Sequence, residues 1–387
     1  MTIPTFDVIV LGVGGVGSAA LDQLARRGLK VLGIDRFPPG HDRGSSHGRT
    51  RLIRQAYFEH PDYVPLLKRA YELWSDLSDR SGKTLYHEVG VLQAGRPDGT
   101  VVPGVLASSR QHGLDVEELS EEQVAARFPG LRVPLPLVAV FERRAGYLDV
   151  EDCVREAARL AVEQGATLEI GASIRAWKVD GSGVLVETDR GAFRATSLVV
   201  SAGAWAGTLL AGLCIPFQVV RKSLYWYAAP ERLYSPALGF PGFLYETDGA
   251  SFYGFPRIDE RGLKAAEHTG GLPVADPLRV DRNPDPGETL RVEQFLAEYL
   301  PGVNREPLHF ATCLYTLSPD GHFVVDRHPE HRQVAFAAGL SGHGFKFATV
   351  LGEALADLAQ HGQTRLPIGF LSCQRPALLA SRTPRRA

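Results

Sequence analysis

The sequence predicts an α/β protein in which a larger α/β domain is interleaved with a smaller α+β domain built on an antiparallel sheet. Its 387 residues exceed the usual size of a single domain. The chain opens with a strand, a glycine-rich turn, a helix and a second strand, which is a βαβ unit. Residues 216–314 are rich in aromatic, proline and β-branched residues between turn signals, which favours an antiparallel sheet.

The composition is that of a globular protein with a substantial core, since 44% of the residues are hydrophobic and 22% are charged. A formal charge of −2 supplies no overall positive field, so we expect neither a nucleic-acid partner nor a membrane. The N-terminus runs into a strand without a basic region and a cleavage site, and no apolar run approaches about 20 residues, so we expect a cytoplasmic protein. The four cysteines are far apart, which indicates neither a disulfide framework nor a metal site.

The elements follow from local patterns. The first strand is expected at residues 6–11, the helix extends to about Arg27, and the second strand covers residues 31–35. Apolar residues at helical spacing predict helices over residues 60–77 and 151–164.

Short strands, a helix and proline-rich loops are expected between those two helices, over residues 86–145. Further strand patterns cover residues 173–179, 183–187 and 197–201, and the last ends in a second glycine-containing turn. A strand at 334–338, another glycine-rich turn and a helix at 345–360 complete the chain.

The first turn carries a nucleotide-binding pattern. Gly12, Gly14 and Gly17 fit G-x-G-x-x-G between a strand and a helix, as a Rossmann-type unit requires. They permit the tight turn, the approach of the backbone to a pyrophosphate, and close helix–strand packing. Asp35, at the end of the second strand, is placed to accept hydrogen bonds from ribose hydroxyls. The alternative is a glycine-rich turn without a ligand, and the turn alone serves NAD and FAD equally.

Two features outside this turn favour FAD. Residues 337–346 form a second strand–glycine–helix element, whose helix N-terminus would face the negative charge that a reduced flavin develops. Lys346 falls in the first turn of that helix, where a cation opposes the helix dipole unless an anion lies close by. The alternative is a surface lysine that the helix tolerates.

Several segments resemble the monomeric sarcosine oxidase family of flavoenzymes, which also includes N-methyl-L-tryptophan oxidase and pipecolate oxidase. The likeness spans about residues 5–376, and the matching segments are 44–54, 253–256, 262–264, 313–316, 326–329 and 340–347. It implies a monomeric FAD-dependent oxidase of small N-methyl or cyclic secondary amino acids. Oxidative demethylation with O2 would give formaldehyde, the demethylated amino acid and H2O2.

The resemblance implies a role for each of several residues. The flavin would be attached covalently through its 8α-methyl group to Cys313, which is otherwise read as a small buried hydrophobe. Arg54 and Lys346 would clamp the substrate carboxylate, since a planar guanidinium holds a carboxylate bidentately and a lysine adds a point charge. Arg51 would lie against the flavin near the cysteine. For the arginines the alternative is a solvated basic loop.

Lys264 would be the site of oxygen activation, where its cation stabilises superoxide. His268 would orient or electrostatically tune the amine, and Tyr253 and Tyr315 would form walls of the substrate pocket. A structural role is the alternative for each of these residues. The further residues expected at the cofactor are Ser45, His47, Gly342, Gly344 and Phe345, and no metal is expected.

The chain also departs from the family pattern. Ser46 and Arg49 stand where sarcosine and N-methyltryptophan oxidases usually have His and Asp. The substrate therefore stays open among sarcosine, N-methyltryptophan and proline-like rings. The rival functions are a flavin dehydrogenase with an acceptor other than O2, an NAD-dependent dehydrogenase, and a non-catalytic dinucleotide-binding protein.

The expected domain division combines these elements. The FAD-binding domain would comprise residues 1–85, 146–215 and 315–376, the substrate domain residues 86–145 and 216–314, and a flexible tail residues 377–387.

Overall fold

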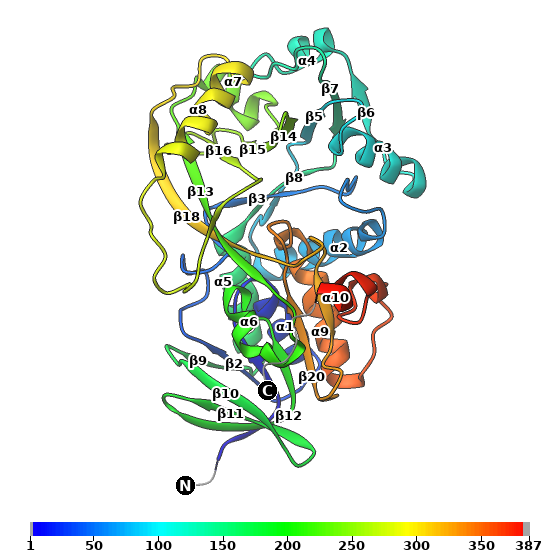
Figure 1. Cartoon of the computed structure of the whole chain (residues 1–387), viewed down its shortest axis with the longest axis vertical. Helices are drawn as coiled ribbons and strands as arrows, with labels where there is room; N and C mark the ends of the chain where they lie inside the picture. The colour runs from blue at the N-terminus through cyan, green and yellow to red at the C-terminus, as the bar shows by residue number, and fades with distance from the viewer. Residues whose placement is uncertain (1–2, 382–387) are drawn as a thin grey trace.

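The computed structural model describes residues 3–381. Their strands form an eight-stranded sheet, a nine-stranded sheet and a small three-stranded sheet, with helices packed around them (Figure 1). The nine-stranded sheet lies above the eight-stranded sheet in that view. The expected fold class, an α/β unit joined to a unit built on a second sheet, is confirmed.

The eight-stranded sheet is built around β1 (Thr5–Leu11), which pairs in parallel with both of its neighbours, β2 and β12. β2 in turn pairs in parallel with β9, and β12 with β20. The other strands of this sheet are β2 (Val31–Asp35), β9 (Thr167–Ile170), β10 (Ile174–Asp180), β11 (Gly183–Thr188), β12 (Gly191–Val200), β19 (Val324–Arg327) and β20 (Val334–Ala338).

Both faces of this sheet are covered, which explains why its central strands are almost continuously apolar. Val8 and Val10 point into one hydrophobic cluster, and Ile9 and Leu11 point into another on the opposite face. The first cluster is closed by α1 (Gly15–Arg26), α2 (Tyr63–Ser81), α5 (Val150–Glu163) and α9 (Ala348–His361). The second cluster is closed by residues 206–215, which include α6 (Ala206–Leu209), and by Leu378 of α10 (Pro376–Ser381).

The nine-stranded sheet is mixed. Its described pairs are antiparallel except that β14 runs parallel to β5, so the expectation of a purely antiparallel sheet is wrong at this pair. The two strands are far apart in the sequence, and a long connection does not impose the hairpin that enforces antiparallel pairing. The strands are β5 (Val91–Gly95), β6 (Glu117–Leu119), β7 (Val138–Glu142), β13 (Gln218–Tyr227), β14 (Gly242–Thr247), β15 (Ala250–Phe255), β16 (Leu263–Glu267), β17 (Leu272–Pro273) and β18 (Pro307–Leu317).

The helices of this part differ in number from the expectation. Two helices, α3 (Val101–His112) and α4 (Glu121–Arg127), occupy the region where one was expected. α4 begins at Ser120 with a reciprocal capping box to Gln123, which stabilises a helix too short to show a clear apolar period. α7 (Glu231–Tyr234) and α8 (Pro286–Tyr299) complete the set, and α8 packs on the nine-stranded sheet.

The two faces of the nine-stranded sheet have different roles. Trp226 pairs with Lys264, and Lys264 pairs with Phe255, so these side chains share one face. Their neighbours Tyr225 and Ala265 alternate to the other face and join the hydrophobic cluster that α8 covers. The first face packs against the three-stranded sheet of β3 (Thr50–Ile53), β4 (Tyr86–His87) and β8 (Gly146–Asp149) through Leu52 and Tyr147.

The C-terminal part brings two corrections. The last long helix begins with a 3-10 turn, Phe345–Phe347, and α9 starts at Ala348, so Lys346 lies before the α-helix instead of in its first turn. Pro376–Ser381 forms the short helix α10, whose Leu378 is fully buried, so residues 377–381 are not the irregular tail that was expected. Residues 382–387 of that tail lie outside the described residues.

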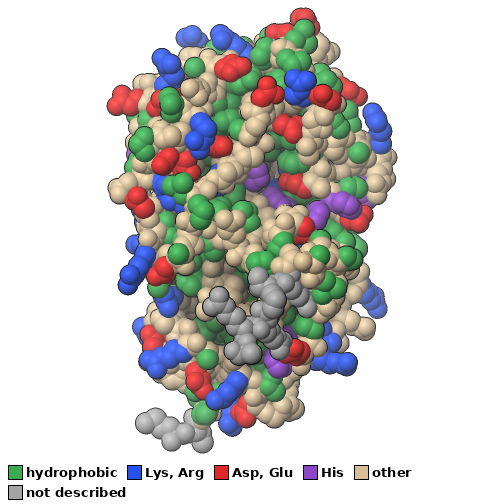
Figure 2. Space-filling view, viewed as in Figure 1, with side chains coloured by type: hydrophobic (Ala, Val, Ile, Leu, Met, Phe, Trp, Pro, Cys, Tyr) green, Lys and Arg blue, Asp and Glu red, His purple; other side chains and the backbone are tan. Residues whose placement is uncertain are grey.

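On the face drawn in Figure 2, basic and acidic side chains are interspersed, and histidines gather near the centre. Between residues 3 and 381, no helix is long and apolar enough to cross a membrane.

Candidate active site

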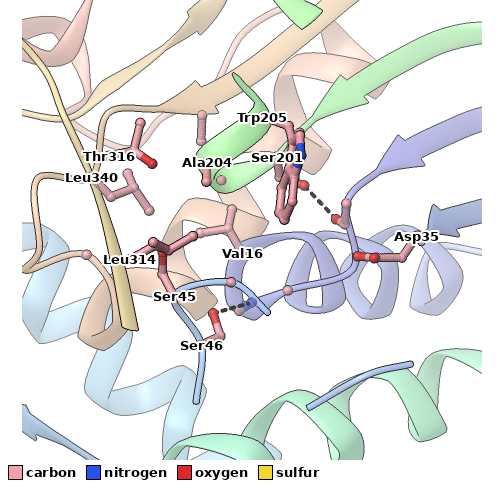
Figure 3. Close-up of a pocket in the computed structure, with 18 of the residues that line it drawn as sticks. Val16, Asp35, Ser45, Ser46, Ser201, Ala204, Trp205, Leu314, Thr316 and Leu340 are labelled. Carbon is pink, nitrogen blue, oxygen red and sulfur yellow. Dashed lines mark hydrogen bonds between the residues drawn. The ribbon is translucent and has the colours of Figure 1, made fainter. Parts of the chain in front are cut away.

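A long cavity of about 230 Å³ runs along the carboxyl ends of the central parallel strands. One end is lined by Gly12, Gly14 and Asp35. Figure 3 shows its middle, where Val16, Ser45, Ser46 and Leu314 approach from different elements. Of the residues expected at the cofactor, the far end is lined by Arg51, Gly342, Gly344 and Phe345, together with Tyr315.

The glycine turn at the first end has no room for a side chain at Gly12 or Gly17. Gly12 has a φ of +88°, and a Cβ there would lie 2.7 Å from the Ser201 carbonyl oxygen. A Cβ on Gly17 would lie 1.8 Å from the Gly12 carbonyl oxygen, so Gly17 serves helix packing and does not line the cavity. A Cβ on Gly14 would meet nothing nearer than Ser46 Oγ at 3.7 Å, so its bare backbone borders open space. These are the three features that a phosphate-binding turn requires.

Polar groups hold this turn in place. Asp35 accepts hydrogen bonds from the Val13 and Phe37 amides, at 2.6 and 2.9 Å. Ser46 Oγ accepts one from the Gly15 amide at 3.0 Å, and Ser201 Oγ donates to the Gly12 carbonyl oxygen at 2.9 Å (Figure 3).

The residues present fit a dinucleotide. The cavity is elongated, begins at the N-terminus of α1, where amides favour negative charge, and has an acidic side chain at the end of β2. Thr316 Oγ1 in its wall is buried and has no hydrogen-bond partner among the described residues, which is a costly arrangement unless a ligand or a water provides one.

A second cavity, of about 50 Å³, adjoins the first. Both are lined by Arg51, Tyr315, Gly342 and Phe345, so a ligand in the long cavity would present its end to the small one. The remaining lining residues of the small cavity are Leu52, Arg54, Phe58, Glu59, Leu244, Tyr253, His268, His343 and Lys346.

Besides Arg51, which both cavities share, the small cavity contains two further basic residues, Arg54 and Lys346, and one acidic residue, Glu59. Arg54 Nη2 donates to both carboxylate oxygens of Glu59, at 3.0 and 3.1 Å, while its buried Nη1 has no partner among residues 3–381. Lys346 Nζ donates to the His343 carbonyl oxygen at 2.9 Å. Burial and the nearby Arg54 lower the pKa of Lys346 to about 7. Burial raises the pKa of Glu59, but Arg54 and His343 lower it by more, so that the pKa is about 2. The cavity thus has an excess of positive charge that suits an anion.

The opposite wall is aromatic and neutral. The His268 Nδ1 and Tyr315 hydroxyl oxygen lie 3.3 Å apart, and the Tyr253 ring stands edge-on to His268 at 6.2 Å. Burial, followed by the neighbouring His343, lowers the pKa of His268 to about 3, so this imidazole is neutral at physiological pH. The wall can therefore accept or donate hydrogen bonds without adding charge.

Arg51 and Cys313 form a charged pair beside the boundary of the two cavities. Arg51 Nη2 donates to the Ser45 carbonyl oxygen at 2.9 Å and to Cys313 Sγ at 3.2 Å. Burial raises the pKa of the Cys313 thiol, but Arg51 and His47 lower it more, to about 6. Neither Cys313 nor His47 lines either cavity, whereas Arg51 lines both. Seen from the cavities, the Cys313 sulfur therefore lies behind Arg51.

Lys264 also lies behind the cavity walls. Its Nζ donates to the carbonyl oxygens of Gly48 and Thr50, at 2.6 and 3.0 Å, and is 4.7 Å from the centre of the Phe255 ring. Burial, together with Arg51, lowers its pKa well below the usual value. The structure thus brings Arg54, Lys346, Tyr253, His268 and Tyr315 to one cavity and leaves Lys264 outside it.

Some residues at the small cavity were not predicted from the sequence. Glu59, His343 and Phe58 line the cavity, and the hydroxyl of Tyr57, which does not line it, lies 2.5 Å from His343 Nδ1. Their proximity depends on packing between the loop before α2 and the turn after β20. A partial signal was available, since Glu59 follows Arg54 closely in the sequence. The described residues contain no group of His, Cys, Asp or Glu side chains able to hold a metal ion.

Comparison with known proteins names the chemistry of the long cavity. The family model described as FAD dependent oxidoreductase matches residues 7–358. The chain belongs to this family of FAD-dependent oxidoreductases. The ligand expected in the long cavity of this oxidoreductase is therefore FAD, and the NAD-dependent and non-catalytic alternatives are set aside.

Curated relatives resemble this oxidoreductase over nearly its whole length. It is 40% identical over 383 residues to a monomeric sarcosine oxidase of Bacillus sp. (strain B-0618), covering 97% of each chain. It is 40% identical over 362 residues to the N-methyl-L-tryptophan oxidase of Citrobacter koseri, covering 92% of this chain and 95% of the relative. The expected membership of the sarcosine oxidase group is confirmed.

Solved structures share the fold of this oxidoreductase. The open form of NikD, an unusual amino acid oxidase of nikkomycin biosynthesis, is 26% identical with a TM-score of 0.84, over 95% of this chain and 97% of that chain. L-proline dehydrogenase from P. horikoshii is 23% identical with a TM-score of 0.84, over 96% and 98% of the two chains, and at that identity it shows the fold alone.

Proposed function

We propose that this FAD-dependent oxidoreductase is an oxidase of small N-methyl or secondary amino acids, of the sarcosine type. The observation that carries the proposal is the small cavity next to the cofactor cavity, which is lined both by Arg54 and Lys346 and by the neutral side chains of Tyr253, His268 and Tyr315. The names of the relatives, sarcosine oxidase and N-methyl-L-tryptophan oxidase, support the same class of substrate.

The charged side orients the substrate. Arg54 and Lys346 hold the α-carboxylate, and the guanidinium gives the geometry while the ammonium gives charge. Glu59 keeps one edge of the Arg54 guanidinium occupied and fixes its plane. With the carboxylate held, the nitrogen and its methyl carbon extend toward the wall that both cavities share, at Tyr315.

The neutral side receives the amine. His268 and Tyr315 offer hydrogen-bonding groups that carry no charge, so they favour the neutral amine, which has the electron pair that oxidation requires. Tyr253 closes the cavity against water.

FAD, when bound, takes two electrons from the C–N bond and passes them to O2, which yields H2O2. Loss of those two electrons and of two protons converts the neutral N-methyl amine to an imine, and the same two electrons and two protons convert O2 to H2O2. Addition of water to the imine carbon then releases formaldehyde and the demethylated amino acid. Each turnover therefore consumes one substrate, one O2 and one water, and it releases one formaldehyde, one demethylated amino acid and one H2O2.

Two further assignments belong to this proposal. Cys313 holds the flavin covalently, supported by a thiol whose pKa is lowered to about 6, because the thiolate is the reactive form. Lys264 supplies the positive charge near the site of O2 reduction, supported by its burial and its place beside Gly48 and Thr50. The proposal also includes a monomeric state, in line with the name of the monomeric sarcosine oxidases, and a place in the cytoplasm.

The size of the small cavity favours a small substrate. A water molecule needs about 10 to 15 Å³ on the same kind of measure, so a cavity of about 50 Å³ accommodates a few non-hydrogen atoms without rearrangement. Sarcosine is closer to this size than N-methyltryptophan, whose indole ring needs more room than the small cavity offers.

The proposal is tested by product analysis in air with sarcosine, N-methyl-L-tryptophan and L-pipecolate. We expect equal amounts of H2O2 and formaldehyde from sarcosine. Dye reduction without H2O2 would instead identify a dehydrogenase with another electron acceptor. Absence of both products with every amine would refute the proposal.

A further inference from the structure

A third buried lysine, besides Lys264 and Lys346, lies on the same face of the nine-stranded sheet as Cys313 and Tyr315. Lys222 of β13 stands directly opposite Cys313 of β18, and it is only 2% exposed. In an antiparallel pair, opposed residues point to the same face, so Lys222 shares the face of Cys313 and Tyr315. Nothing in the proposed chemistry uses this residue.

The ammonium of Lys222 holds the segment that follows His268. Its Nζ donates to the Thr269 carbonyl oxygen at 2.5 Å and lies 5.8 Å from the centre of the Tyr315 ring. The fit around its stem is close, because a Cβ on Gly271 would lie 3.1 Å from Lys222 Cδ. The lysine therefore fixes residues 269–271 against β13.

That segment in turn sets the position of His268. The His268 amide donates to the Ser251 carbonyl oxygen at 2.6 Å, and the Ser251 amide donates to Thr269 Oγ1 at 3.0 Å. The imidazole is thereby presented to the Tyr315 hydroxyl at 3.3 Å. A shift of the Thr269 carbonyl would move the backbone that carries this imidazole.

The charge of Lys222 acts on His268. The nearest carboxylates are engaged elsewhere, since Glu267 pairs with Arg291 at 2.8 Å and Glu288 accepts a hydrogen bond from Ser223. Lys222 lowers the pKa of His268, after burial and His343. The charged and titratable groups that face His268 from the elements around it are Tyr253, Tyr315, His343, Glu59, Lys346 and Lys222.

We propose that Lys222 is a positioning residue for His268 and Tyr315: its ammonium fixes the Thr269 carbonyl, and with it the backbone that presents the imidazole to the Tyr315 hydroxyl. The effect of His268 and Tyr315 on the substrate amine rests on the proposed function, whereas the geometry of the two side chains does not. Removing the ammonium should slow flavin reduction and leave carboxylate binding by Arg54 and Lys346 in place.

The test compares Lys222→Gln, which keeps a donor and loses the charge, with Lys222→Arg, which keeps the charge. Lys68→Gln is the matched control, since Lys68 Nζ also donates to a backbone carbonyl, that of His112, but at an exposed site. In anaerobic single turnovers we expect flavin reduction to slow about tenfold in Lys222→Gln, with KM changed less than about twofold, because misplacement of a reacting group lowers rate more than binding. Lys222→Arg should recover most of the rate, and Lys68→Gln should match the unaltered enzyme.

A double-mutant cycle distinguishes positioning from general stability. If Lys222 acts through His268, Lys222→Gln should have little further effect in a His268→Asn background. Equal effects of Lys222→Gln in both backgrounds, or an unaltered rate in Lys222→Gln itself, would overturn the proposal.

A third measurement needs no active substrate. Histidine NMR spectra of the unaltered, Lys222→Gln and Lys68→Gln flavoproteins should show the His268 resonance displaced in Lys222→Gln alone, and an unchanged His268 resonance in Lys222→Gln would also overturn the proposal. If no amine reduces the flavin, the proposed function fails, and this comparison still decides for or against Lys222.

Discussion

The proposed function gives the Arg54 guanidinium two partners, Glu59 and the substrate carboxylate. Glu59 takes Nη2, and the buried Nη1 has no partner among the described residues. A buried donor without a partner costs roughly 1 to 3 kcal/mol, so the free protein keeps an unfavourable arrangement that an incoming carboxylate relieves. Glu59 limits the positive charge of the cavity without cancelling it, because Lys346 adds a second cation.

The titration of Lys346 gives a pH-dependent prediction. Burial and Arg54 lower its pKa to about 7, so the ammonium is present below that pH and is lost above it. Acetate, which stays ionised over this range, should therefore bind about tenfold more weakly at pH 8 than at pH 6. Perturbation of the flavin absorbance measures the affinity. In Lys346→Met the dependence should vanish, and acetate affinity that is constant from pH 6 to 8 in the unaltered enzyme would contradict the role of Lys346.

The thiol of Cys313 gives a second prediction. Arg51 and His47 lower its pKa despite burial, whereas burial keeps the pKa of Cys153 well above the usual value. We expect the flavin to stay with the acid-precipitated protein in the unaltered enzyme and in Cys153→Ser, and to be released in Cys313→Ser. Retention of flavin by precipitated Cys313→Ser would show that the linkage lies elsewhere.

For single residues, the sequence could not tell which distant segments the fold brings together. Arg54 and Lys346 were expected to act together, and the structure places both in one cavity. Glu59, Tyr57 and His343 were missed, because no pattern along the chain tells which loops pack together. Lys264 was expected at the reaction centre, yet its protons are directed to Gly48 and Thr50 behind Arg51.

Among the elements, the turn between β1 and α1 depends most strongly on which residue type occupies each position. A Cβ at Gly17 would overlap the Gly12 carbonyl oxygen at 1.8 Å, so either α1 or β1 has to move. Gly17→Ala should lower the free energy of unfolding by more than about 3 kcal/mol and reduce bound flavin. The comparison is Gly369→Ala, where a Cβ meets nothing within 4 Å and φ is not positive.

Thermal unfolding and flavin content measure both variants. Gly369→Ala should retain the melting temperature and the flavin of the unaltered enzyme. A Gly17→Ala protein with the same melting temperature and full flavin would show that the turn has more freedom than its packing indicates.

Elements with strong periodic patterns could be predicted, and those set by distant contacts could not. The strands at residues 31–35 and 334–338 lie where their apolar runs placed them. The parallel pairing of β14 with β5 and the helix at Pro376–Ser381 had no such signal, because each depends on a partner surface. The 3-10 turn before α9 depends on the same packing and moves Lys346 out of the α-helix.

For the whole molecule, the decisive feature is that the site belongs to neither sheet alone. The long cavity follows the parallel strands, and the small cavity adds Leu244, Tyr253 and His268 from the nine-stranded sheet region. The alternation of that sheet gives one face to the α8 core and the other to the site. The two-part architecture could be predicted from composition and motifs, whereas the dimensions of the small cavity required the structure.

The central claim is that FAD in this protein is reduced by a small secondary amino acid held between Arg54, Lys346 and the aromatic wall. The most direct test is anaerobic addition of sarcosine, and separately of N-methyl-L-tryptophan, to the purified flavoprotein while its visible spectrum is recorded. We predict that sarcosine bleaches the flavin, with a second-order rate constant at least about tenfold above that for N-methyl-L-tryptophan, because one large ring exceeds the room in the small cavity. Faster bleaching by N-methyl-L-tryptophan would contradict the substrate size, and no bleaching by any secondary amino acid would contradict the function.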